Sequence, residues 1–182
     1  MSLKREYSAG CVVFKKEKAK ILHLIGKHSG YHKWVLPKGL IEKGEKGPET
    51  AIRETEEEMG VKGKLVLKKP IFKEQYFFYA DFKKNKEKER KIESEERKQG
   101  KPVRRVAVYQ EKGGKKTKVF KTVSFFLAEF KSGDPSNHDW EMSEAGWFEY
   151  DKAFNLLAFK GEKQALKKAK EKISLFNQEK LL

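Results

Sequence analysis

The segment GLIEKGEKGPETAIRETEEEMGV, residues 39–61, constrains the fold more than any other part of the chain. Pro48 suits the first turn of a helix because its missing N–H has no partner there, and Gly60 suits the position just after a helix ends. Apolar or small residues recur between them every three to four positions, which predicts a helix of about three turns with one buried face. The arc beside this face is acidic.

The acidic arc consists of Glu54, Glu57 and Glu58. Carboxylates three and four residues apart on a helix repel one another unless a cation lies among them. Oxygen-only ligands suit hard cations such as Mg²⁺ or Mn²⁺, and Mg²⁺ keeps coordination positions for water and substrate phosphates. We therefore expect these glutamates to be metal ligands. Arg53 lies one turn before Glu57 and is expected to hydrogen-bond its carboxylate.

This segment resembles the Nudix box, in which a glycine, five residues, a glutamate and seven residues precede Arg-Glu-apolar-x-Glu-Glu-x-Gly-apolar. The matching positions are Gly39, Glu45, Arg53, Glu54, Glu57, Glu58, Gly60 and Val61; Thr55 stands where an aliphatic residue is usual. Nudix hydrolases cleave a nucleoside diphosphate linked to another moiety, using Mg²⁺ held by this helix. The resemblance implies an α/β (α+β) fold with a mixed β-sheet sandwiched between helices, and it adds Gly39 to the candidate metal ligands.

Residues just before the box narrow the resemblance. The run Trp34-x-Leu36-Pro37-Lys38-Gly39 is similar to the corresponding segment of Nudix hydrolases of the dinucleoside tetraphosphate (diadenosine tetraphosphate) type, as is Ser8-Ala9-Gly10 in the first expected strand. An ammonium group at the mouth of a carboxylate site offsets the charge of a polyphosphate. Lys38 is therefore a candidate substrate-binding residue; the alternative is a solvated loop lysine.

A second acidic segment offers a candidate for proton transfer. Glu141 lies six residues before Trp147, a spacing that resembles the late glutamate of the same family, and Glu144 is the competing candidate. A loop carboxylate near the metal can ligate it or accept a proton from the attacking water. The sequence leaves Glu54 and Glu141 open as the general base, and we group Arg53 with them as catalytic.

The remaining elements complete one domain of 182 residues. In the aromatic-rich strand 70–82, Tyr76 and Tyr79 are candidates for stacking on a substrate base, against a packing role. Two β-rich runs flank Gly113-Gly114 within residues 102–130. We expect a hairpin of two strands at 7–14 and 19–25, and further strands at 64–68 and 145–150. Helices are expected at 152–157 and at 161–176, the first of them with Asp151 as its N-cap.

Residues 83–118 form a lysine-rich insertion relative to a minimal Nudix domain. They contain fifteen Lys or Arg and six Glu, a net charge of +9 out of the total of +15. We favour a solvated insertion over a basic arm that binds nucleic acid.

A single cysteine, Cys11, and the lack of an apolar run long enough for a membrane span or a signal peptide predict a cytoplasmic protein without a membrane partner.

The expected reaction is metal-dependent hydrolysis of a pyrophosphate linkage by attack of water on phosphorus. A dinucleoside polyphosphate such as diadenosine tetraphosphate is the favoured substrate, on the basis of the resemblance. The alternatives are another nucleotide, namely an oxidised nucleoside triphosphate, a nucleotide sugar or a capped RNA end, or else a non-catalytic ligand sensor or a nucleic-acid-binding protein with the same fold.

Overall fold

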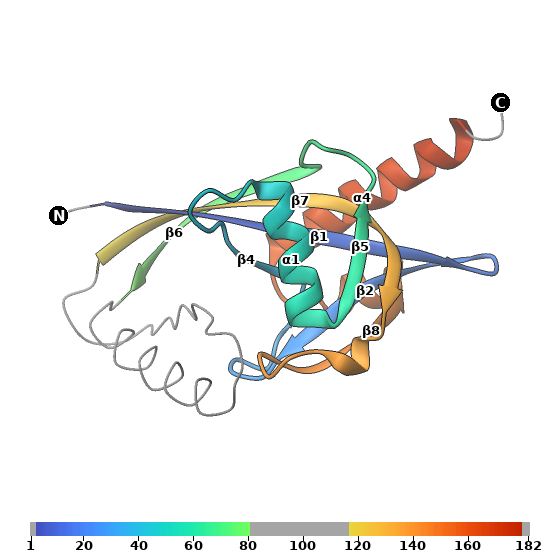
Figure 1. The fold of residues 1–182 in the computed structure, drawn as a ribbon, viewed down its shortest axis with the longest axis horizontal. Coiled ribbons are helices and arrows are strands. Elements are labelled where there is room, and N and C mark those ends of the chain that lie inside the picture. Colours follow the sequence, from blue (N-terminus) through green and yellow to red (C-terminus); the bar gives the residue numbers. More distant parts are fainter. Residues whose placement is uncertain (1–2, 81–116, 180–182) are drawn as a thin grey trace. The chain divides into compact units, whose positions relative to one another are not determined.

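The computed structural model describes residues 3–80 and 117–179. These residues fall into two compact units, a smaller one of residues 3–6, 75–80 and 117–121 and a larger one of residues 7–74 and 122–179. The predictions for residues 83–116, most of the basic insertion, lie outside the described ranges. The elements are β1 (Lys4–Glu17), β2 (Lys20–His28), β3 (Trp34–Val35), β4 (Lys38–Leu40), α1 (Gly47–Met59), β5 (Val61–Leu65), β6 (Phe72–Ala80), β7 (Thr117–Gly133), η1 (Pro135–Asn137), β8 (Met142–Glu149), α3 (Tyr150–Leu156) and α4 (Lys160–Glu179) (Figure 1).

The strands form an eight-stranded sheet with the order β3-β2-β1-β7-β5, to which β4, β6 and β8 are joined by pairing with β1, β7 and β2. The predicted hairpin of β1 and β2 is confirmed, with Phe14 opposite His23 and Glu17 opposite Lys20. Strands β1 and β7 run in the same direction (Figure 1), whereas β5 and β7 are antiparallel. The sheet is therefore mixed, as the resemblance implied.

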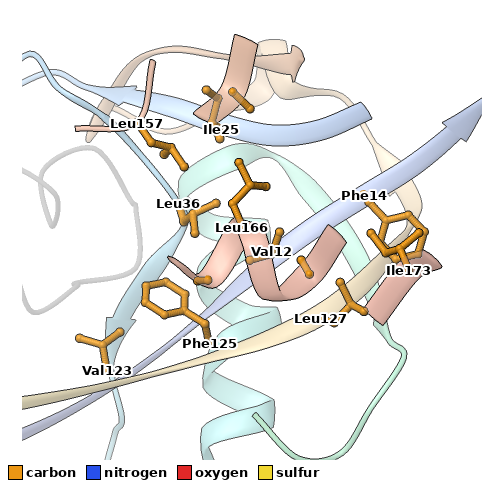
Figure 2. Close-up of a cluster of buried hydrophobic side chains, with 13 residues drawn as sticks. Val12, Phe14, Ile25, Leu36, Val123, Phe125, Leu127, Leu157, Leu166 and Ile173 are labelled. Carbon is orange, nitrogen blue, oxygen red and sulfur yellow. The ribbon is translucent and has the colours of Figure 1, made fainter. Parts of the chain in front are cut away.

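Side chains alternate between the two faces of the central strands, and helices cover both faces. Ala51 of α1 shares one buried cluster with Val13 of β1. Phe14, the next residue of β1, lies in the other cluster together with Leu166 and Ile173 of α4 (Figure 2). The predicted sandwich of a sheet between helices is thus confirmed, with α1 on one face and α3 and α4 on the other.

Several element boundaries differ from the sequence prediction, and two of them lie next to a helix. The strand expected at 64–68 begins at Val61, directly after Gly60 ends α1. The helix expected at 152–157 begins at Tyr150, with Glu149 as N-cap at φ −61° and ψ 155°. The prediction that Asp151 is the N-cap is wrong, because the extended last residue of β8 leads straight into the helix. No helix in the described ranges is long and apolar enough to cross a membrane.

His23 gives the fold a pH dependence. The residue is 1% exposed. Burial lowers the pKa of its imidazole to about 4, and the Lys170 ammonium adds to this shift. A contact with the Phe148 backbone acts in the opposite direction but is the smaller effect. The unfolded chain therefore takes up the proton at a higher pH than the folded protein does, so stability falls between about pH 6.5 and pH 4. At pH 5 we expect a loss of about 2 kcal/mol relative to pH 7.

His23→Leu should remove this contribution, and urea unfolding of both proteins at pH 7 and pH 5 measures it. The variant's loss of stability between the two pH values should be smaller than that of the wild type by about 2 kcal/mol. Equal losses in the two proteins would contradict this account of His23.

Candidate active site

Helix α1 positions the acidic residues, and both of its ends follow from the sequence. At its start the Lys46 N–H donates to Glu49 at 3.0 Å, and Pro48 lies in the first turn. At its end Gly60 adopts φ +66°, a left-handed conformation. An added Cβ there would come within 2.6 Å of the Asp134 carbonyl oxygen, so the position has no room for a side chain. Both predicted helix boundaries are confirmed.

Arg53 connects three of the acidic side chains. Its Nε and Nη2 donate to the two carboxylate oxygens of Glu45 at 2.8 and 2.9 Å. Its Nη1 donates to Glu54 at 2.7 Å and to Glu57 at 2.9 Å. The predicted Arg53–Glu57 interaction is therefore present. The two-point contact with Glu45 fixes the plane of the guanidinium group, and this role of Glu45 did not follow from helix periodicity because Glu45 precedes the helix.

Gly39 leaves room for the carboxyl group of Glu54. It lies on β4 opposite Ala9 of β1, and an added Cβ would overlap the Glu54 carboxyl group. Burial raises the pKa of Glu54, even though the ion pair with Arg53 acts in the opposite direction. A glycine at this position is thus a steric requirement of the Glu54 side chain.

Glu58 is the most enclosed of the three candidate ligands, with 7% of its surface exposed. Its carboxylate accepts the backbone N–H of Lys38 at 2.9 Å. Burial raises the pKa of Glu58 well above its ordinary value; Lys38 opposes this, and the negative charges of Glu141 and Glu54 add to it. The structure thus brings Glu141 into electrostatic range of Glu58.

The loop that carries Glu141 is tied to the end of β2. The N–H and the hydroxyl of Ser29 donate to the Glu141 carbonyl oxygen at 2.8 and 3.0 Å. Glu144, the competing candidate, forms an exposed ion pair with Lys27 at 2.8 Å. The geometry therefore favours Glu141 over Glu144 as the loop carboxylate of the site.

Lys38 is paired with a residue that the sequence interpretation missed. Its Nζ lies 2.9 Å from a carboxylate oxygen of Glu162 on α4, a residue only 1% exposed. The other oxygen of Glu162 accepts the Leu36 N–H at 3.1 Å. In this structure the Lys38 ammonium group is thus engaged by α4. The available sequence signal was a glutamate four residues before Leu166, on the buried stripe of the last helix.

Tyr76 and Tyr79 belong to the smaller unit, where they are 37% and 53% exposed. Their role as stacking residues stays a prediction.

The side chains of α1 fit a hard divalent cation by their chemistry. Within residues 3–80 and 117–179, no group of three His, Cys, Asp or Glu side chains is arranged so that it could hold a metal ion. Two of the carboxylates face Arg53, and Glu58 faces the Lys38 amide. The donors are nevertheless all carboxylates. A divalent cation would relieve the repulsion of Glu58 by Glu141 and Glu54, which adds to the effect of burial on the pKa of Glu58.

Comparisons with known proteins agree on one family. The family model described as NUDIX domain matches residues 4–170. A protein named as mutator protein MutT4 of Mycobacterium tuberculosis is 28% identical over 157 residues, which are 85% of this chain and 49% of that protein. The chain therefore spans about half the length of this curated relative.

Three solved structures illustrate the similarity of fold. Ap4A hydrolase of C. elegans has a TM-score of 0.56 at 22% identity, covering 92% of this chain and 98% of that one. A MutT protein from Methanosarcina mazei Go1 has a TM-score of 0.56 at 16% identity, with coverages of 94% and 97%. The NUDIX domain of Shewanella oneidensis NrtR, complexed with ADP ribose, has a TM-score of 0.53 at 14% identity, with coverages of 93% and 88%.

Proposed function

Because the chain belongs to the NUDIX family, we propose that it is a metal-dependent pyrophosphohydrolase acting on a nucleoside diphosphate derivative. The observation that carries this proposal is the buried Glu58, which lies among further carboxylates on a helix whose Arg53 holds Glu54 and Glu57. A solvated acidic helix would have no reason to bury one carboxylate and to fix two others.

The reaction requires neutralisation of charge and placement of a water molecule. A pyrophosphate linkage is shielded from attack by its own anionic oxygens. A divalent cation, Mg²⁺ or Mn²⁺, would be held by Glu54, Glu57 and Glu58, with Gly39 as a further candidate, and would supply both charge neutralisation and a more acidic water. Arg53 fixes the carboxylates of Glu54 and Glu57 from one side of the helix.

Two carboxylates are candidates for taking the proton from the attacking water. Burial raises the pKa of Glu54, which brings this group closer to the pH at which a base transfers protons efficiently. Glu141 lies on a loop fixed by Ser29 and interacts electrostatically with Glu58. Of Glu54→Gln and Glu141→Gln, the variant whose residual kcat loses its dependence on pH in the acidic range identifies the base.

A dinucleoside polyphosphate such as diadenosine tetraphosphate is the substrate class we favour. The support is the run from Trp34 to Gly39, which resembles that type of enzyme, and the similarity of fold to a C. elegans protein named Ap4A hydrolase. One other structure in the comparison, the NUDIX domain of Shewanella oneidensis NrtR, is complexed with ADP ribose, which is a different nucleotide. Nucleic-acid binding by residues 83–118 stays a less favoured hypothesis.

A substrate panel tests the proposed function. The protein is incubated with Mg²⁺ and, separately, a dinucleoside tetraphosphate, a nucleotide sugar, an oxidised nucleoside triphosphate and a capped RNA, and the products are separated by ion-exchange chromatography. We expect the dinucleoside tetraphosphate to have a kcat/KM at least about tenfold above the others, which corresponds to about 1.4 kcal/mol. A higher kcat/KM for another member of the panel would reassign the substrate class, and no turnover of any member would contradict the enzyme assignment.

A further inference from the structure

Glu162 is a buried carboxylate that has no place in the reaction described above. It lies in the first turn of α4, on the same face as Ala165, Leu166 and Ala169, all of which are fully buried. That stripe belongs to the cluster that contains Leu36 (Figure 2). A charged group at such a position costs free energy unless it is paired and hydrogen-bonded, so its contacts indicate its role.

Two short contacts connect Glu162 to the chain between the start of β4 and the end of β3. One oxygen accepts the Leu36 N–H at 3.1 Å, and the other lies 2.9 Å from the Lys38 Nζ. The Lys38 ammonium also donates to the Leu36 carbonyl oxygen at 3.4 Å. One carboxylate therefore holds both the backbone of Leu36 and the side chain of Lys38.

The same segment ends on a candidate metal ligand. The backbone N–H of Lys38 donates to Glu58 at 2.9 Å, and the next residue, Gly39, lies against the Glu54 carboxyl group. A chain of direct contacts thus runs from Glu162 on α4, through Lys38, to Glu58 on α1. It links helices on opposite faces of the sheet.

We propose that Glu162 is a positioning residue of the active site, which acts through Leu36 and Lys38 to hold the Glu58 carboxylate in place for metal binding. The inference rests on the proposed function, in that Glu58 is taken as a metal ligand. Groups that hydrogen-bond metal-ligating carboxylates commonly matter about 10- to 100-fold for metal affinity. Glu162 acts indirectly, through Lys38, whose backbone N–H donates the hydrogen bond to the Glu58 carboxylate.

The surroundings of Glu162 explain why an ion pair, and not a neutral contact, holds this segment. Glu74 of β6 lies against Gly161, where an added Cβ would overlap the Glu74 carboxyl group. Two carboxylates therefore lie at the start of α4, and the Lys38 ammonium supplies the opposite charge. Loss of the Glu162 charge would remove the carboxylate that lies 2.9 Å from this ammonium, and the ammonium could then reorient toward the α1 glutamates.

Mn²⁺ binding to the 182-residue protein without substrate, measured by the electron paramagnetic resonance signal of free Mn²⁺, tests the proposal. Glu162→Leu removes both contacts and should weaken Mn²⁺ binding by at least about tenfold. Glu162→Gln keeps an acceptor for the Leu36 N–H and should lose less. Glu171→Gln, on the same helix in an exposed pair with Lys168 at 2.8 Å, is the matched control and should bind Mn²⁺ within about twofold of the wild type.

A double variant separates positioning from general destabilisation. Lys38→Met combined with Glu162→Gln replaces the ion pair by neutral side chains of similar size, which buried sites often tolerate. Its Mn²⁺ affinity should be closer to the wild type than that of Glu162→Gln alone, because no unpaired ammonium remains. If the two residues act independently, the double variant should bind Mn²⁺ no better than Glu162→Gln alone. All measurements are made well below the melting temperature of each variant, and kcat and KM are recorded in parallel.

The outcomes for Glu162 and for the proposed function are distinguishable. Weakened Mn²⁺ binding in Glu162→Leu, with rescue in the double variant, supports the proposal even if no substrate is turned over. Unchanged Mn²⁺ affinity in a folded Glu162→Leu protein overturns it, whether or not the enzyme is active. If Glu162→Leu does not fold, a double variant that binds Mn²⁺ no better than Glu162→Gln alone overturns it in the same way.

Discussion

Glu58→Gln is expected to lower turnover by at least about 100-fold, a loss of about 2.7 kcal/mol in transition-state stabilisation. The amide keeps the size of the side chain and can still accept the Lys38 N–H, but it removes the negative charge that a divalent cation requires. Glu57→Gln is expected to act in the same direction. Steady-state rates with saturating Mg²⁺ and the preferred substrate of the panel measure both.

Stability measurements show whether this loss arises from the metal site or from the fold. Burial disfavours the charged form of Glu58, so the metal-free Glu58→Gln protein should melt at the same temperature as the wild type or above it. The rise in melting temperature that Mg²⁺ gives the wild type should be absent in the variant. Glu56→Gln is the control, because Glu56 lies on the same helix in an exposed pair with Lys62 at 3.0 Å. Full Mg²⁺-dependent activity in Glu58→Gln would show that Glu58 is not a metal ligand.

Gly39→Ala should reduce kcat by about 100-fold, although it adds only one methyl group. That methyl would overlap the Glu54 carboxyl group, so Glu54 has to move. A displacement of about 1 Å in a catalytic group can cost about 10² in rate. The conformation of Gly39 is not left-handed, so the backbone tolerates alanine and the effect is confined to the side chain of Glu54.

Gly47→Ala is the matched control for Gly39→Ala. An added Cβ at position 47 would lie 3.5 Å from the Phe126 ring, an ordinary packing distance. Its activity should stay within about threefold of the wild type, since packing of this kind leaves the site unchanged. Equal activities for the two alanine variants would show that Glu54 does not need the space beside Gly39.

The parts of the site that could be predicted from the sequence are those fixed by local rules. Pro48, Gly60 and the helical period define α1, and the spacing of Glu54, Glu57 and Glu58 on one arc follows from them. Arg53 and Glu57 lie one helical turn apart, so their interaction could be predicted from the same helical period. The family resemblance rested on this same segment, and the match over residues 4–170 confirms it.

The parts that could not be predicted depend on contacts between distant segments. Glu162 lies more than a hundred residues from Leu36, and no periodicity pairs them. The proximity of Glu141 to Glu58 likewise arises from the sheet, which brings the loop before β8 to the end of α1. The engagement of the Lys38 ammonium by α4 was missed for the same reason, because a loop lysine beside a phosphate site and one beside a buried glutamate have the same local sequence.

Hydrolysis of a dinucleoside tetraphosphate in ¹⁸O-labelled water, with mass spectrometry of the nucleotide products, shows whether the protein cleaves its substrate by metal-dependent attack of water on phosphorus. We expect one product of each turnover to carry one ¹⁸O atom on phosphorus, the reaction to require Mg²⁺ or Mn²⁺, and Glu58→Gln to slow it by at least about 100-fold. Cleavage that continues at the same rate in the presence of a metal chelator, or products without the label, would contradict this mechanism.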